Sequence, residues 1–417
     1  MQPKISRMTI LARDRRMLEH RPRTKEKKTH FEHFLAPLAW LGRYRLIKRT
    51  AALRRRSEAE ETMKAVRFYG KEDVRVEDVP TPNVMGATQV MVRPLTCGIC
   101  GTDLHEFAGG PIVTPAAPHK FTGAVLPQIF GHEFSAEVIE VGSSIKRVRK
   151  GDRISVQPLI MPLDDYYSRR GLNHLSPSMG CVGLSWAWGG MGELAVINDY
   201  NANLIPDGIT DEQGAMVEPT AVALYGVDRA KVTGGSTVLI TGAGPIGALV
   251  ILICSAFGAS LIVVSEPNAN RRRHIESLGV ATAVLDPKHV NVVEYIRENT
   301  EEGVGVDSAI ECSGIEAALN TCVEAVRNHG TVVQTGLHVR KALVDPALWA
   351  MKDITIEATW CYEITMWPRV IRMISSGKLP VEKIITGRIA PEAIVEKGFR
   401  SLLNPSGSEM KVMVKMA

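Results

Sequence analysis

One segment near the middle of the chain constrains the fold more than any other. It reads V-L-I-T-G-A-G-P-I-G over residues 238–247, a short apolar run that enters three regularly spaced glycines. An apolar helical stretch follows, and the next apolar run, over residues 261–264, leads to Glu266. This order of strand, glycine turn, helix, strand and acidic residue is typical of a βαβ unit that binds a dinucleotide.

The residues of the glycine turn have distinct predicted roles. Gly242 permits the tight turn, Gly244 lets the backbone approach the pyrophosphate, and Gly247 lets the helix pack closely on the strand. Pro245 and Ile246 open the helix, whose amino terminus is expected to face the phosphates.

The cofactor is expected to be NAD, because Glu266 can accept hydrogen bonds from free ribose hydroxyls and would repel a 2′-phosphate. The basic run Arg271, Arg272 and Arg273 leaves NADP open, since such a cluster could neutralise that phosphate. A basic cluster at such a position more often lies in the solvated first turns of a helix. Arg271 is included among the expected cofactor-binding residues.

The sequence predicts an α/β fold. After residue 226 apolar and helical stretches alternate, which predicts a doubly wound parallel sheet. About six strands are expected, at residues 237–241, 261–265, 283–285, 306–311, 331–334 and 354–357. From residue 63 to about 160, short Val- and Ile-rich runs broken by Gly and Pro predict a small β-barrel. A helix over 368–376 and a strand over 411–414 are expected to return to that barrel.

Charge is spread unevenly along the 417 residues. Residues 1–62 hold 17 Lys and Arg against 7 Asp and Glu, whereas the rest holds 33 against 38. The body is therefore mildly acidic, and we expect no nucleic-acid partner. No apolar run approaches the roughly 18–20 residues that span a bilayer, so no membrane partner is expected.

The basic segment 1–62 is expected to be a disordered or loosely helical extension. A mitochondrial presequence is the second interpretation, although the acidic residues in the segment count against it. A nucleic-acid-binding arm is the third. Seven scattered cysteines suit a reducing compartment better than a disulfide framework, so we expect a cytoplasmic protein, with the mitochondrion as the alternative.

A second motif pair carries chemistry. C-G-I-C-G-T-D-L-H runs over residues 97–105, and G-H-E-F runs over residues 131–134. Cysteine, histidine and glutamate at such separations can hold one zinc ion. A redox pair of Cys97 and Cys100 is the alternative for the thiols. The string H-E-F-S-A lacks a second histidine four residues on, so a metalloprotease helix is excluded.

With these motifs the chain resembles the zinc-dependent medium-chain dehydrogenases over residues 63–417. K-G-D-R, G-G-M-G-E and E-P-T-A-V-A are further shared strings, and the proline-rich insert between the two metal motifs resembles that of (R,R)-2,3-butanediol dehydrogenases. The resemblance implies a GroES-like β-barrel catalytic domain over 63–225, completed by 358–417, and a Rossmann domain over 226–357.

The resemblance also implies which residues hold the metal. Cys100, His132 and Glu133 would bind one catalytic zinc, with Glu218 as the fourth protein group, either directly or through water. Cys97 would be structural. A helix-start carboxylate is the alternative for Glu218.

The same resemblance implies a proton path. The Thr102 hydroxyl would bond the substrate alcohol, and its proton would pass by way of the cofactor ribose to His105 and solvent. Glu133 is counted with them among the catalytic residues, and Asp103 would orient His132. His105 could alternatively cap a turn.

Relatives of this kind usually carry a second, structural zinc held by four cysteines in a lobe. Here residues 158–176 contain no cysteine. We therefore expect one zinc per chain, and a lobe held by inward packing of four side chains: Leu163, Tyr166, Tyr167 and Leu172.

The implied activity is hydride transfer between NAD and a secondary alcohol or vicinal diol of the 2,3-butanediol and acetoin type, in a dimer or tetramer. A sorbitol- or xylitol-type polyol dehydrogenase is the nearest alternative. A zinc-free quinone reductase and a silent cofactor-binding protein are less favoured, because the Cys100, His132 and Glu133 set is intact.

The composition break near residue 62 yields the first testable prediction. A chain that begins at Met63 is expected to fold and to turn over like the full chain, because the patterned core starts there. Circular dichroism and NAD-linked turnover of the two purified chains check this. An insoluble or inactive shortened chain would show that residues 1–62 belong to the fold.

Overall fold

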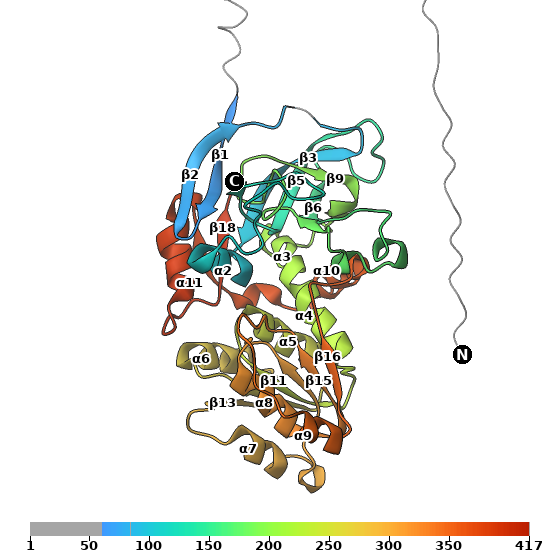
Figure 1. Ribbon diagram of the computed structural model, residues 1–417, viewed down its shortest axis with the longest axis vertical. Helices are drawn as coiled ribbons and strands as arrows, with labels where there is room; N and C mark the ends of the chain where they lie inside the picture. Colours follow the sequence, from blue (N-terminus) through green and yellow to red (C-terminus); the bar gives the residue numbers. More distant parts are fainter. Residues whose placement is uncertain (1–60, 84, 417) are drawn as a thin grey trace, which may run out of the picture. The chain divides into compact units, whose positions relative to one another are not determined.

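The computed structural model describes residues 61–83 and 85–416 (Figure 1). The expectation for the basic extension therefore lies outside the described residues, apart from Glu61 and Thr62. Within the described part, no helix is long and apolar enough to cross a membrane.

The glycine-turn region forms the predicted doubly wound parallel sheet. Its strand order is β13-β12-β11-β14-β15-β16, and every pair in it is parallel. The strands are β11 (Thr237–Thr241), β12 (Leu261–Ser265), β13 (Ala283–Leu285), β14 (Val306–Glu311), β15 (Val326–Gln334) and β16 (Thr355–Ala358). The expected α/β class is confirmed. Strand β15 begins five residues before its expected start, and the last expected strand is displaced by one residue.

Helices cover both faces of this sheet (Figure 1). Val238 and Ile240 of β11 join one buried cluster with α5, whereas Leu239 joins another with α7 and α8. Both faces of the strand are therefore apolar, which is why its sequence reads as an unbroken hydrophobic run. The helices are α5 (Pro245–Ala256), α6 (Ala269–Leu278), α7 (Val292–Glu298), α8 (Glu316–Ala325) and α9 (Pro346–Met351).

The first part of the chain forms antiparallel sheets with helix α2 (Gly101–Gly109). The largest has the order β10-β6-β5-β3-β18-β17, and β9 also pairs with β3. Its strands are β3 (Gln89–Gly98), β5 (Glu133–Val141), β6 (Arg153–Val156), β9 (Ala195–Asn198), β10 (Ala202–Leu204), β17 (Ile385–Ile389) and β18 (Lys411–Lys415). A three-stranded sheet contains β1 (Thr62–Gly70), β2 (Asp73–Pro80) and β4 (Gln128–Ile129). A two-stranded sheet contains β7 (Leu159–Ile160) and β8 (Gly180–Cys181).

The carboxyl-terminal segment returns to these sheets, as expected. Strand β18 pairs antiparallel with β3, and the ring of Phe399 lies 5.0 Å from that of Phe107 and 6.1 Å from that of Phe130. The segment also contains α10 (Trp367–Ser375), a π-helix (Ile394–Arg400) and α11 (Ser401–Leu403). The last strand of the chain thereby lies beside the strand that leads into the first metal motif.

Two helices, α3 (Asp211–Ala215) and α4 (Val217–Arg229), lead from the antiparallel sheets toward the parallel one. Helix α4 runs through the expected domain boundary at 225/226 without a break. Its buried face packs with Trp367 and Val370 of α10 and with residues of α5 in one apolar cluster. The packing of α4 against α5 and α10 therefore fixes the position of its first turn, which carries Glu218.

The packing expected for the cysteine-free lobe is wrong in part. Leu163 is 68% exposed and Tyr166 is 59% exposed, whereas Tyr167 and Leu172 are half-buried. Buried polar residues anchor the lobe instead: Asn173 and His174 are buried, and the His174 ring lies 5.6 Å from that of Tyr225 on α4. Leu163 and Tyr166 do not reach the core from this lobe, so their side chains stay exposed.

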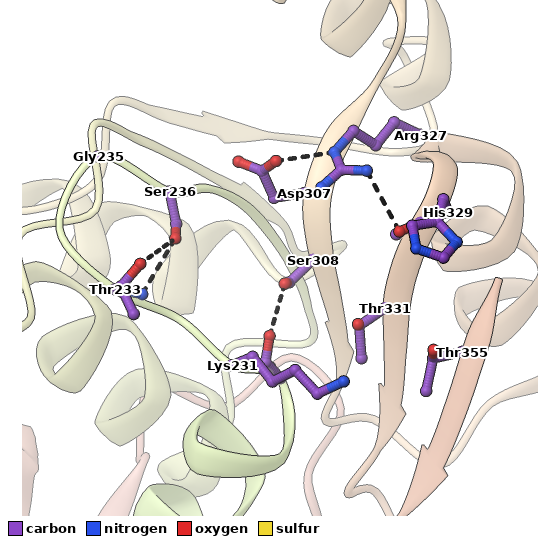
Figure 2. A pocket seen from close by; sticks show the side chains of 12 residues that line it. Lys231, Thr233, Gly235, Ser236, Asp307, Ser308, Arg327, His329, Thr331 and Thr355 are labelled. Atoms are coloured by element: carbon purple, nitrogen blue, oxygen red, sulfur yellow. Dashed lines mark hydrogen bonds and ion pairs between the residues drawn. The ribbon is translucent and has the colours of Figure 1, made fainter.

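A cavity of about 450 Å³ lies at the amino-terminal ends of the parallel strands (Figure 2). The polar groups along its wall largely bond one another: Asp307 pairs with Arg327 at 2.8 Å, and the Ser308 hydroxyl donates to the Ala230 carbonyl at 2.7 Å. Ligands of such sheets bind at the opposite, carboxyl-terminal edge. The cavity therefore lies away from the glycine turn.

Candidate metal and cofactor site

Three adjacent strands, β5, β3 and β18, meet at the first metal motif. Gly98 of β3 pairs with Glu133 of β5 on one side and with Met413 of β18 on the other. A Cβ at Gly98 would lie 2.3 Å from Glu133 Oε2 and 2.8 Å from Lys411 Cε. The missing side chain of Gly98 therefore leaves room for Glu133 and Lys411 to meet across β3.

Cys100, His132 and Glu133 lie together, as the sequence predicted. One potential ligand atom from each lies within 4.8 Å of the others, and this is the one such group of three or more among the described residues. Gly131 precedes the histidine with φ of 101°, and a Cβ there would lie 2.6 Å from Cys97 Sγ. A residue with a side chain at 131 would displace the buried Cys97, so the backbone turn that aims His132 requires glycine.

The imidazole of His132 lies beside the buried carboxylate of Asp103. His132 Nδ1 lies 3.6 Å from Asp103 Oδ1, and the other Asp103 oxygen accepts from the Cys100 backbone N–H at 3.0 Å. Burial alone would lower the pKa of His132, but the Asp103 carboxylate and the Cys100 sulfur outweigh it and hold that pKa well above the usual range. Burial raises the pKa of Asp103 to about 6, against the effect of His132.

A lysine that the sequence analysis did not single out completes the site. Lys411 is 1% exposed, and its ammonium forms an ion pair with Glu133 Oε2 and donates to the Ile99 carbonyl at 3.0 Å. Burial opposes the charged form, but Glu133 and Cys100 raise the pKa of Lys411. The one signal in the sequence is a lysine that begins the otherwise apolar strand K-V-M-V-K, which is a weak indication.

Glu218 lies outside the group of three but faces the same space. It is 7% exposed and accepts a hydrogen bond of 2.9 Å from the hydroxyl of Tyr362, a fully buried residue that sequence reasoning missed. Burial and the Glu133 carboxylate raise the pKa of Glu218 to about 7, and His132 opposes this. Nothing in the local sequence indicates Tyr362, which is 144 residues from its partner.

The two residues of the expected proton path lie on α2. Thr102 and His105 are three positions apart, which places them on one face of the helix. The Thr102 hydroxyl lies 3.7 Å from Cys100 Sγ, and the side chains of Thr102 and His105 are half-buried.

The donor set fits a zinc ion. Sulfur, imidazole nitrogen and carboxylate oxygen are the ligands that zinc takes in proteins. Burial and the Glu133 carboxylate raise the pKa of Cys100, and the same two causes raise the pKa of Glu218. The negative charges of these groups therefore repel one another when no cation lies between them. A divalent cation would relieve that repulsion and displace the protons.

The glycine turn has the close approaches that a dinucleotide site requires. Gly242 has φ of 90°, and a Cβ at Gly247 would lie 1.9 Å from the Gly242 carbonyl oxygen, whereas the space beside Gly244 is open except for Arg271 Nη1 at 3.9 Å. Helix α5 begins at Pro245, directly after this open position, and Ile246 follows it. The turn therefore leaves its backbone accessible where phosphates would lie.

Glu266 and the three arginines take different positions. Glu266 is 3% exposed, and its carboxylate accepts from the backbone N–H groups of Ala243 at 2.7 Å and Asn268 at 2.8 Å. Arg272 pairs with Asp286 at 2.8 Å, and Arg273 bonds within its own helix. Arg271 Nε is buried and has no hydrogen-bond partner within the described part of the chain. One arginine of the run, not three, therefore faces the glycine turn.

Known proteins share this arrangement. Residues 86–207 match the model of the alcohol dehydrogenase GroES-like domain, and residues 245–376 match that of zinc-binding dehydrogenases. The (R,R)-butanediol dehydrogenase of Neisseria gonorrhoeae is 36% identical over 84% of this chain and 99% of its own length. The chain belongs to the zinc-binding alcohol dehydrogenase family. It is therefore a zinc-dependent oxidoreductase that acts on CH–OH donors.

Three further relatives extend the comparison. Human sorbitol dehydrogenase is 31% identical over 83% of this chain and 94% of its own length. The crystal structure of 2R,3R-butanediol dehydrogenase from Bacillus subtilis superposes with a TM-score of 0.79, at 34% identity over 85% of this chain and 99% of that one. A solved relative at 29% identity is bound to NADP, in agreement with an NAD(P) cofactor.

The ion pair of Lys411 yields the second prediction. Lys411→Met leaves the Glu133 carboxylate buried without its partner, which is expected to lower the free energy of unfolding of the metal-free protein by about 3–5 kcal/mol. Lys415→Met is the matched control, because Lys415 lies on the same strand with a side chain 54% exposed, and a change within about 0.5 kcal/mol is expected there. Urea unfolding followed by circular dichroism measures both. Equal stability of the two variants would contradict the role of the pair.

Proposed function

We propose that the protein interconverts a vicinal diol of the 2,3-butanediol type and the corresponding acyloin, with NAD as the preferred cofactor. The observation that carries this is the pair of buried carboxylates, Glu133 and Glu218, beside Cys100 and His132. A vicinal diol places its second oxygen near the metal, and a donor set rich in carboxylate oxygens suits such a polar substrate. The similarity to butanediol dehydrogenases supports the same choice over sorbitol.

Cys100, His132 and Glu133 are proposed to hold the zinc, and Glu218 to hold it directly or through water. Lys411 takes one oxygen of Glu133, which leaves the other oxygen for the metal. Asp103 orients His132, since its carboxylate faces Nδ1 and leaves Nε2 for the ion. When bound, zinc supplies a Lewis acid for the substrate oxygen, and NAD supplies the hydride acceptor.

The protein's own part in the reaction is binding, orientation and proton transfer. The Thr102 hydroxyl is proposed to accept the proton of the substrate alcohol while it donates its own toward His105, which exchanges with solvent. Gly242, Gly244, Pro245, Ile246 and Gly247 would hold the pyrophosphate, with Arg271 beside it. Glu266, fixed by the Ala243 and Asn268 N–H groups, would meet the ribose.

The coarser organisation belongs to the same proposal. We keep a barrel domain over 63–225 with 358–417, and a dinucleotide domain over 226–357. A homo-oligomer is supported by exposed apolar side chains in the segment that precedes the edge strand β16, among them Leu343 at 79% and Met351 at 73% exposure. A cytoplasmic location is supported by seven free cysteines.

The metal assignment gives the third prediction. Cys100→Ser and His132→Ala are each expected to abolish turnover of butanediol and acetoin and to lower zinc well below one ion per chain, because each removes a ligand. Binding of NADH, measured by fluorescence, should survive. Cys254→Ala is the control, since Cys254 is buried in α5 within the apolar core.

Elemental analysis and NAD-linked assays with butanediol, acetoin and sorbitol measure these outcomes. Wild-type protein is expected to hold one zinc per chain. Activity retained without Cys100 or His132, or a stoichiometry near two, would contradict the assignment. Faster turnover of sorbitol than of butanediol would move the substrate to the polyol class.

The arrangement of Glu266 and the arginines gives the fourth prediction. NAD is expected to exceed NADP at least tenfold in kcat/KM, or about 1.4 kcal/mol, because one arginine faces the turn while a carboxylate lies beside it. Initial rates with both cofactors at a fixed butanediol concentration provide the measurement. Equal or better use of NADP would show that Arg271 outweighs Glu266.

A further inference from the structure

A second buried carboxylate lies at the carboxyl-terminal edge of the parallel sheet. Glu311, the last residue of β14, is 0% exposed. Its Oε1 accepts from the Ser313 backbone N–H at 2.6 Å, the Ser313 hydroxyl at 2.6 Å and the Gly314 N–H at 2.8 Å. One oxygen of Glu311 thus fixes the turn that follows β14.

The other oxygen of Glu311 reaches the next loop. Oε2 lies 3.2 Å from Nε2 of His338, whose side chain is 16% exposed. The Glu311 backbone carbonyl also accepts from the Thr335 and Gly336 N–H groups at 2.8 and 2.9 Å. A single residue therefore holds the loop after β14 and the loop after β15 together.

These loops lie beside the glycine turn. A Cβ at Gly242 would lie 2.9 Å from Ser313 Cβ, one at Gly336 would lie 2.3 Å from the Gly314 nitrogen, and one at Gly314 would lie 2.3 Å from the Leu337 carbonyl oxygen. The sheet order reverses between β11 and β14, and dinucleotides bind at that point on the carboxyl-terminal edge. The contacts run without a gap from the glycine turn to the loop after β15.

Beyond His338 the loop has little packing. Val339 is 64% exposed, and the next polar anchor is the backbone N–H of Leu343, which donates to Glu316 at 2.8 Å. Between these points the loop depends on the His338 side chain for its position on the cofactor side.

We propose that His338 and Glu311 form a clamp that sets the loop after β15 as one wall of the cofactor crevice, with both acting as positioning residues for dinucleotide binding. This rests on the dinucleotide part of the proposed function and not on the choice of substrate. The Nε2–H of His338 donates to a carboxylate that otherwise has a buried, unpaired oxygen. Loss of that donor leaves the buried oxygen without a partner and loosens the loop.

The sheet offers a matched control pair at its other edge. His329 Nδ1 lies 3.1 Å from Asp353 Oδ2, but the two side chains are 83% and 88% exposed. This solvent-exposed histidine–aspartate pair, beside the cavity of Figure 2, is expected to contribute little to stability.

The test compares His338→Leu with His338→Gln and His329→Leu in the zinc-loaded full chain. His338→Leu is expected to weaken NADH or NADPH binding, whichever the wild type binds more tightly, about tenfold by fluorescence titration. Its kcat at saturating cofactor is expected to stay within about twofold. In cofactor-free protein, the backbone amides of residues 336–342 are expected to exchange with deuterium faster. His338→Gln keeps an N–H donor at similar reach and should restore both properties, and His329→Leu should change neither.

Unchanged cofactor affinity or unchanged exchange in His338→Leu would overturn the clamp, as would an equal effect of His329→Leu. A His338→Gln variant as weak as His338→Leu would also overturn it. If His338→Leu does not fold, His338→Asn, whose amide is too short to reach Glu311, carries the same expectation. Binding and exchange are read without any alcohol substrate, so failure of the clamp is distinguishable from an error in the diol assignment.

Discussion

The buried ion pair of Glu133 and Lys411 joins the last strand of the described chain, β18, to β5 at the metal group. A buried pair is costly to desolvate and is sustained only where geometry and further hydrogen bonds compensate. Here β3 supplies Gly98 to make room and the Ile99 carbonyl to take a second ammonium proton. The position of β18 beside β3 in the large sheet is therefore tied to the same ion pair as the site.

Both halves of the site follow one design, in which glycines allow close approach and buried carboxylates then fix the backbone. Gly131 allows the backbone turn before His132 without displacing Cys97, and Gly98 leaves room for the ion pair of Glu133 and Lys411. At the cofactor edge Glu266 holds the turn at Ala243, and Glu311 holds the turn at Gly314. Carboxylates are strong acceptors for several backbone N–H groups at once, which suits turns whose donors have no strand partner.

The zinc site and the cofactor edge are linked through α4. Its first turn carries Glu218, and its buried face packs with α5, the helix that follows the glycine turn. Tyr362 then reaches back from beyond β16 to bond Glu218. The orientation of Glu218, the proposed fourth metal-facing group, therefore depends on the parallel sheet as well as on the antiparallel one.

The sequence by itself determined the elements and the motif residues. Four strands of the parallel sheet were predicted to the residue, because alternating βα units bury both faces of each strand and their apolar runs end sharply. The motif spacing indicated a zinc site, and the family resemblance selected Cys100, His132 and Glu133 as its residues. Lys411, Tyr362 and the Glu311–His338 contact were decided by tertiary structure alone. Their partners lie 278, 144 and 27 residues away, and strand pairing and loop packing, not local pattern, bring them together. The exposed Tyr166 shows the converse: an aromatic residue without a neighbouring core stays in solvent whatever its hydrophobicity suggests.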